Sequence, residues 1–212
     1  MKQIKKLLPT LIIIILLTPF HLLSQNFASE GELKKLDTAR ELDNLTDMEK
    51  DIILEINKVR NNPKRYAELY IKPMLSDNNK QQEWMVDVTE CIDDLSNDQS
   101  KPALQPNAGL IRAAKDLAKD QSETGQTGHR GSDNSTMRSR IERYGSAFNC
   151  AENVSYGRFS AIDIVCGWLI DHGIASRGHR KNIMGDYTQI GVSTATHPNY
   201  RYMCVVNFTD TE

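Results

Sequence analysis

Five segments of the chain carry apolar residues at the spacing of a helix. Four of them place an apolar residue at every third or fourth position, which is typical of an amphipathic helix. These four are 46–61, 84–95, 106–118 and 137–145. The fifth, 160–170, is almost continuously apolar after Ser160, and this pattern predicts a buried helix capped by that serine. The first helix opens with Thr46-Asp47-Met48-Glu49, the form of a capping box, and should end near Asn62-Pro63.

Strand-like patterns follow in the second half of the chain. Over 200–208, Tyr202, Cys204, Val206 and Phe208 alternate with Met203 and Val205, as in a strand. A second strand-like run covers 188–194, and a polar hairpin loop lies between the two. A weaker alternation over 151–156 predicts a third strand. Helices that precede strands in this way are typical of an α+β domain with a layered αβα arrangement.

The N-terminus differs from the rest of the chain. Lys2, Lys5 and Lys6 precede a short apolar run, 11–17, and Ser24 follows it, as in a cleaved secretory signal peptide. A membrane anchor is the alternative, but the unbroken run is short for a bilayer, and Pro19 and His21 interrupt the apolar stretch that follows it. We therefore predict a signal peptide over 1–24, a flexible polar leader over 25–45 and one domain over 46–212, in a secreted or periplasmic protein without a stable membrane anchor.

Charge and cysteine content narrow the class of protein. Removing the three lysines of the signal leaves 23 basic residues against 28 acidic ones, a net charge of −5. This balance argues against a nucleic-acid partner, which needs a basic face. Export would permit disulfides, but the four cysteines allow three pairings and can also stay free and buried. They are Cys91, Cys150, Cys166 and Cys204. We expect a monomer.

Three histidines lie in glycine-containing segments, where loops often present side chains to a cavity. His129 follows Gly128, and His172 and His179 belong to the stretch DHGIASRGHRKNIMG, 171–185. His197 lies in the polar hairpin loop, where we expect it to be exposed to solvent. The basic residues of 171–185 either order this loop or bind anions, and we expect them to form a solvated basic turn. These residues are Arg177, Arg180 and Lys181.

Two carboxylates accompany these histidines. Glu152 opens the predicted strand 151–156, and Asp171 falls on the apolar stripe of the buried helix, three residues after Trp168. A charge on such a stripe is costly unless it is paired or bound to a metal. Zinc accepts imidazole nitrogen and carboxylate oxygen as ligands, so a zinc site is one explanation, and unrelated polar loops are the other.

The order of several short motifs resembles one protein family. The residues Asn57 to Ala67 fit N-x-x-R-x-x-P-x-x-Y/A, and further motifs follow in the family's order up to the closing strand. They are Gly128-His129, Ala151-Glu152-Asn153-Val154, Trp168-x-x-Asp171, Gly178-His179-Arg180-x-Asn182-Ile183 and Ile190-Gly191-Val192. Together they resemble the CAP superfamily of cysteine-rich secretory proteins, antigen 5 and pathogenesis-related proteins, also called the SCP-like extracellular domain. The segment D-x-G-x-x-S-R-G-H-R, 171–180, is similar to that of bacterial-type members.

The resemblance implies a three-layer αβα sandwich around a central, mostly antiparallel sheet. It also implies a cleft of two histidines, His129 and His179, and two acids, Glu152 and Asp171, in which the histidines bind a divalent metal, usually zinc. Asp171 stands where animal members often have Glu, and its shorter side chain argues against direct metal ligation. His172 is then an exposed neighbour of the cleft.

Three functions fit this family. The first, which we favour, is a secreted module that binds a divalent metal and an extracellular ligand, whether lipid, peptide or glycan, without catalysis. The second is a metal-dependent, protease-like hydrolase in which zinc activates water and Glu152 acts as general base. The third is a lipid- or sterol-binding protein with an apolar groove. Fold alone does not decide among them.

Overall fold

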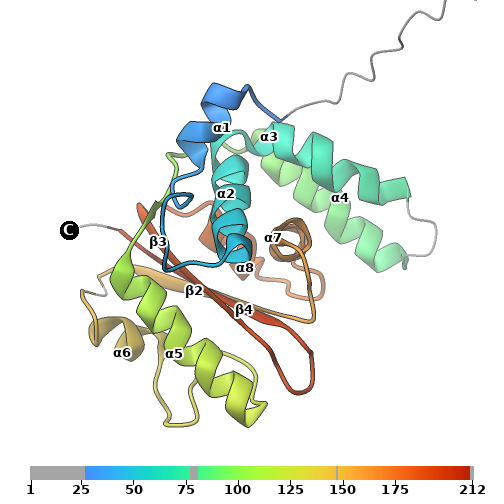
Figure 1. Ribbon diagram of the computed structural model, residues 1–212. Helices are drawn as coiled ribbons and strands as arrows, with labels where there is room; N and C mark the ends of the chain where they lie inside the picture. The colour runs from blue at the N-terminus through green and yellow to red at the C-terminus, as the bar shows by residue number, and fades with distance from the viewer. Residues whose placement is uncertain (1–26, 77–80, 147, 211–212) are drawn as a thin grey trace, which may run out of the picture.

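A four-stranded sheet forms the centre of the computed structural model, which describes residues 27–76, 81–146 and 148–210 (Figure 1). The strands β3 (Gln189–Ala195) and β4 (Met203–Thr209) form the predicted antiparallel hairpin, and β2 (Cys150–Tyr156) pairs antiparallel with β4. The two-residue β1 (Gln105–Pro106) pairs parallel with β3. The strand order is therefore β1-β3-β4-β2, and β2 is an edge strand.

Helices cover both faces of this sheet (Figure 1). One face packs against α5 (Ala108–Thr124) and α6 (Met137–Glu142), and the other against α2 (Asp47–Asn61), α7 (Ala161–Ile170) and α8 (Gly178–Ile183). The remaining helical segments are α1 (Glu30–Leu36), α3 (Pro63–Tyr66), η1 (Ala67–Ile71), η2 (Lys72–Ser76) and α4 (Gln82–Asn97). This architecture confirms the predicted αβα sandwich with a mostly antiparallel sheet.

The alternation of residues along β4 divides the core into two parts. Cys204, Val206 and Phe208 are buried with the helices on the α2 side, whereas Met203 and Val205 pack against α5. A strand turns successive side chains to opposite faces, so one strand contributes to both parts. On β3, Gly191 allows α5 to pack unusually close, because a Cβ atom there would collide with the backbone of Leu110.

The first motif of the chain fixes helix α2 in place. The predicted capping box is present, since Thr46 Oγ1 accepts a hydrogen bond from the Glu49 amide and the Glu49 carboxylate accepts one from the Thr46 amide. The fully buried Asn57 side chain bonds to the backbone of Leu36 and Leu104. Arg60 donates to the carbonyls of Pro102, Ile183, Gly185 and Tyr187, and burial lowers its pKa to about 10.

The prediction of a flexible leader over 25–45 is wrong for its described part beyond residue 29. Ser29 caps helix α1 with a complete capping box, and Leu36, Ala39 and Leu45 are buried. The packing comes from α2, whose Asn57 bonds to Leu36, so the order is not visible in local periodicity. The predicted signal peptide, 1–24, lies outside the described residues, and its cleavage stays a prediction. Among the described helices, none combines the length and the apolar character needed to cross a bilayer.

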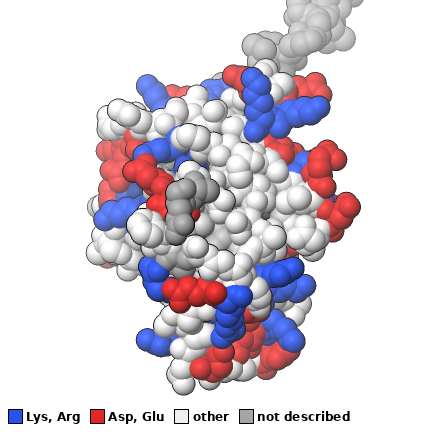
Figure 2. Space-filling view, turned by 90° about the vertical axis from the view of Figure 1, so that its left-hand side faces the viewer, with Lys and Arg blue, Asp and Glu red and all other residues white. Residues whose placement is uncertain are grey.

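The described residues include charged side chains of both signs at the surface and four cysteine thiols. Basic and acidic side chains are interspersed on the face shown in Figure 2. All four cysteines are among the described residues, and none of them is in a disulfide bond. Burial raises the pKa of Cys166 to about 12 and that of Cys91 to about 11. Cys204 is buried as well, and Cys150 is half-buried at the start of β2.

Candidate functional site

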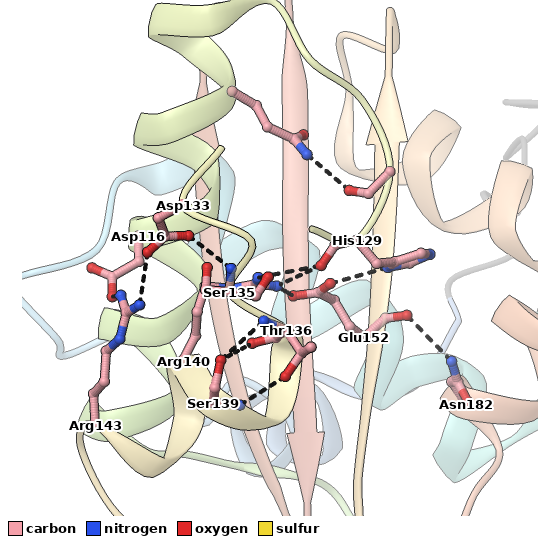
Figure 3. Close-up of polar contacts among 12 residues, drawn as sticks. Asp116, His129, Asp133, Ser135, Thr136, Ser139, Arg140, Arg143, Glu152 and Asn182 are labelled. Atoms are coloured by element: carbon pink, nitrogen blue, oxygen red, sulfur yellow. Dashed lines mark hydrogen bonds and ion pairs between the residues drawn. The ribbon is translucent and has the colours of Figure 1, made fainter. Parts of the chain in front are cut away.

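Two of the four residues expected in one cleft, His129 and Glu152, contact each other. His129 lies in the loop between α5 and α6, and its ring Nδ1 is 3.0 Å from Oε1 of Glu152 on β2 (Figure 3). The Glu152 side chain is 2% exposed, whereas that of His129 is 56% exposed. The site thus presents an imidazole ring to solvent with a buried carboxylate directly behind it.

Side chains other than His129 also hold Glu152 in place. Arg140 of α6, which is 1% exposed, donates from Nη2 to Oε2 at 2.8 Å (Figure 3). In the amide orientation that its neighbours require, Asn207 of β4 donates to the same oxygen at 3.0 Å. Arg140 also donates to the backbone carbonyls of His129 and Ser135. One buried ion pair therefore fixes both the acid and the loop that carries the histidine.

The other side of the His129 loop is held by the β3–β4 hairpin and by Tyr156. The Gly128 amide donates to the Tyr156 hydroxyl at 2.8 Å, and that hydroxyl donates to buried Gln121 at 2.7 Å. His197 was predicted to be exposed, and this prediction is wrong, because it is 2% exposed and its Nε2 lies 3.0 Å from the Gln126 carbonyl. Its ring packs against those of Tyr156 and Tyr200, which the polar composition of the loop does not reveal.

The other two residues expected in the cleft, Asp171 and His179, also contact each other. Asp171 ends helix α7 in the left-handed conformation, with φ +52°, and is 2% exposed. Its Oδ1 lies 2.6 Å from Nδ1 of His179, and its Oδ2 accepts a hydrogen bond from the His179 amide at 2.9 Å. The short side chain of Asp171 thus reaches the ring and the backbone of the same residue. The His179 side chain is 19% exposed.

The segment between these two residues is anchored to α4. Arg177 and Arg180 were predicted to form a solvated basic turn, and the structure contradicts this: Arg180 is 4% exposed, and both form ion pairs with acids of α4. These acids are Asp87, Glu90 and Asp94. Arg177 also donates to the Asp171 carbonyl at 3.0 Å. Lys181 is exposed, and so is His172, which pairs with Asp87.

The two pairs are attached to the same part of the edge strand. The side chain of Asn153 donates to the His179 carbonyl at 3.1 Å, and that of Asn182 donates to the Glu152 carbonyl at 3.4 Å (Figure 3). The amide of Asn182 also donates to Asn153 Oδ1 at 2.8 Å. Neighbouring residues of β2 thus contact the His129 loop on one side and α8 on the other.

Both histidines use the same ring nitrogen for their acid. A carboxylate that carries no proton can only accept hydrogen bonds, so each Nδ1 is placed as a donor, and in a neutral ring the lone pair is then on Nε2. Within the described residues, no group of three or more histidine, cysteine, aspartate or glutamate side chains is arranged to hold a metal ion. Both acids are engaged by their histidines.

Several residues of the site were not predicted from the sequence. Arg140 occurs in an ordinary amphipathic helix pattern, and Gln121, Tyr156 and Asn207 lie at positions that read as core or strand. Their common feature is a buried polar group that bonds to the loop or to the acid of His129. Only pairing across long sequence distances identifies them.

Comparisons with known proteins agree with this fold. The family model described as the cysteine-rich secretory protein family, CAP, matches residues 55–208, which is more than half of the chain. The chain therefore belongs to the CAP superfamily. A search of curated proteins finds no match.

Two solved structures are similar to parts of the chain. An outer surface protein from Borrelia burgdorferi is 23% identical, with a TM-score of 0.44 over 51% of this chain and 78% of that protein. An extracellular protein containing an SCP domain from Bacillus anthracis str. Ames is 22% identical, with a TM-score of 0.44 over 64% of this chain. The match covers 41% of the Bacillus protein.

Proposed function

We propose that this chain is an exported CAP-domain protein in which His129 and His179 bind one divalent metal ion, with zinc as the first candidate, and through it an extracellular ligand. The observation that carries the proposal is the shared geometry of the two rings, each bonded to a buried acid through Nδ1. Histidines that ligate metals commonly donate their other ring N–H to a carboxylate, which orients the ring and raises its basicity.

In this proposal the two acids orient the histidines and do not ligate the ion. Glu152 and Asp171 are almost fully buried, and one oxygen of each contacts the ring of its histidine, while the second oxygen of Asp171 accepts from the His179 amide. When bound, zinc would supply Lewis acidity and open coordination positions, because two imidazoles leave room for water or for a ligand donor. Such a ligand would need an oxygen, nitrogen or sulfur donor that can replace water.

The surroundings of Glu152 favour binding over hydrolysis. A general base needs a lone pair that can reach the water it deprotonates. Oε2 of Glu152 accepts from Arg140 and Asn207, and Oε1 faces His129. The alternative function, a metal-dependent hydrolase, is tested by an activity assay.

One observation supports the third function, binding of a lipid or sterol. A cleft of about 320 Å³ lies between α4 and α7, and apolar and polar residues line it together. Its apolar lining includes Met74, Trp84 and Ile170, and Arg158 is at its polar side. Neither His129 nor His179 lines this cleft, so it can be tested separately from them.

Export of the protein is supported by the predicted signal peptide, 1–24, whose basic start and short apolar run precede Ser24. The family to which the chain belongs is described as one of secretory proteins, which agrees with a location outside the cytoplasm. The mass of the protein recovered after expression tests this part of the proposal, because removal of residues 1–24 leaves an N-terminus at Gln25.

Zinc content of the purified protein tests the metal site. We expect one equivalent in the wild type and a loss of affinity of roughly 10-fold to 100-fold or more in either His129→Ala or His179→Ala, the range seen when even a supporting group is removed. His172→Ala is the matched control, since this exposed histidine pairs with Asp87 and should leave zinc binding unchanged. Equal binding by all four proteins would contradict the assignment. Peptide, ester and glycan substrates, tested with the zinc-loaded wild type and Glu152→Gln, decide between binding and hydrolysis.

A further inference from the structure

Two loops at one end of the sheet form an exposed aromatic surface that the histidine site does not use. They are 157–162, which comprises the loop after β2 and the first two residues of α7, and 196–202, the turn of the β3–β4 hairpin (Figure 1). We refer to them together as the aromatic tip. Large apolar side chains stand out from it, with Phe159 55% exposed, Tyr200 47% and Ile162 39%. Exposed apolar groups that cluster in this way mark an interaction surface.

Ring contacts show that the two loops form one surface. The ring centroids of Phe159 and Tyr202 are 6.1 Å apart, and the Arg201 guanidinium lies 5.7 Å from the centroid of the Phe159 ring. Tyr200 packs against Tyr156 with its centroid 5.3 Å away. Side chains of one loop therefore rest on those of the other.

The charge of the aromatic tip has a single sign. Its two segments contain two arginines, Arg158 and Arg201, and no aspartate or glutamate. Among the described residues neither arginine forms an ion pair, in contrast to Arg143, Arg177 and Arg180. The closest acid in the sequence, Asp163 of α7, lines the same cleft as Arg158 without pairing with it. Arg201 thus keeps its hydrogen-bond donors for an external anion, whereas the Arg158 guanidinium packs against Gly167 of α7 in the cleft between α4 and α7.

The backbone of the hairpin also presents Arg201 in an unusual way. Its φ is +67°, in the left-handed region where glycine or asparagine is the less costly choice. The turn thus carries a long cationic side chain at a position that local conformation disfavours. Its guanidinium lies over the Phe159 ring, so the turn holds a cation beside an exposed aromatic side chain.

We propose that the aromatic tip is a membrane-contact surface that places Phe159, Ile162 and Tyr200 at the interface of an anionic lipid bilayer. Aromatic rings with a polar edge are favoured at the headgroup level of membranes. Arginine binds phosphate groups through paired hydrogen bonds, and an anionic leaflet attracts nearby basic residues. Exposed apolar side chains beside Arg201, which has no acidic partner among the described residues, match both layers of such an interface.

The polar groups of the aromatic tip favour a membrane over a glycan. A sugar-binding surface needs acids or amides beside its rings, because these bond to the hydroxyl groups. The only amide side chain in the two segments belongs to Asn199, and it donates to the Gly125 carbonyl at 3.3 Å. His197 is buried and bonded to the Gln126 carbonyl, so it is not available either.

The membrane contact would bring the histidine loop close to the lipid headgroups. The same hairpin holds the His129 loop through its bonds to Gly125 and Gln126. The aromatic tip itself contains no residue of the histidine pairs. The membrane proposal therefore stands or falls independently of the metal site.

Site-specific fluorescence in the full chain tests the proposal. Phe159→Trp places a reporter in the aromatic tip, and Phe148→Trp is the matched control, because Phe148 is 73% exposed and lies just before β2. Both variants keep Trp84 and Trp168 as the same background. Vesicles of brominated phosphatidylcholine with phosphatidylglycerol should quench the reporter at position 159 and not the one at 148. Because the reporter is local, binding of residues 1–24 to the vesicles does not mimic this result.

Charge and apolar variants complete the test. Arg201→Gln should weaken binding to the anionic vesicles by about fivefold, the attraction expected for one basic residue near such a surface. Phe159→Ser should weaken it on the order of tenfold, because one buried aromatic contact is lost. Both side chains are exposed, and equal thermal unfolding midpoints will show that the fold is intact. Equal quenching at 148 and 159, no quenching at 159, or binding to soluble oligosaccharides instead of vesicles would each overturn the proposal.

Discussion

Replacement of Glu152 by glutamine removes one buried charge and little volume. The Arg140 and Glu152 side chains are 1% and 2% exposed, so the substitution leaves the guanidinium buried without its counter-ion. Loss of one partner from a buried pair costs about 3–5 kcal/mol. Arg140 keeps the carbonyls of His129 and Ser135, which compensate part of its charge, so we expect a value at the lower end, about 3 kcal/mol.

Urea denaturation measures this change in the free energy of unfolding. For a chain of this length, about 3 kcal/mol also lowers the thermal midpoint by roughly 6–12 °C. Glu142→Gln is the control, because Glu142 is exposed and its long 3.8 Å contact with Arg138 lies at the surface. This substitution should change the free energy of unfolding by less than about 0.5 kcal/mol. A double-mutant cycle with Arg140→Met should give a coupling energy within the range of about 0.5–3 kcal/mol seen for contacting residues. Equal stability of Glu152→Gln and Glu142→Gln would refute the buried ion pair.

Three further predictions follow from the scaffold around the site. Hydrogen bonds from Arg177 outweigh burial and lower the pKa of Glu90, so its contribution to stability is present above its ordinary value of 4.5 and is lost as the pH falls. Urea midpoints of the wild type and Glu90→Gln should therefore differ at neutral pH and converge in acid; a constant difference would contradict the ion pairs with α4. Burial raises the pKa of the Cys91, Cys166 and Cys204 thiols and keeps them protonated. A thiol reagent at pH 8 should therefore modify half-buried Cys150 first and the other three cysteines only after unfolding, and mass spectrometry measures this order. Asn57→Ala should cost roughly 1–3 kcal/mol in urea denaturation, because it leaves the Leu104 amide buried without a partner; a smaller loss would mean that water replaces the side chain.

The sequence predicted those features that depend on local pattern. Thr46 and Ser160 cap their helices as expected, and the alternation in β4 divides the core as expected, because caps and periodicity involve residues a few positions apart. The four cleft residues were named from a family resemblance, and the pairing of each histidine with its acid was not predicted, since His129 and Glu152 share no local pattern.

The errors have a common physical cause in contacts between distant segments. Helix α1 is ordered by packing on α2, His197 is buried by tyrosines, and Arg177 is neutralised by acids of α4. In each case a polar local sequence predicted exposure to solvent. Burial of a polar residue becomes visible only when its partner is known, as the unpredicted Arg140 also shows.

X-ray absorption at the zinc edge of the loaded protein tests the central claim most directly. The claim is that His129 and His179 bind one ion through Nε2 while their acids hold Nδ1. We predict two imidazole nitrogens at about 2.0–2.1 Å from zinc, with oxygen donors completing the shell. His129→Ala should reduce the imidazole count to one, and His172→Ala should leave it at two. A zinc shell without imidazole, or one that is unchanged in His129→Ala, would contradict the account.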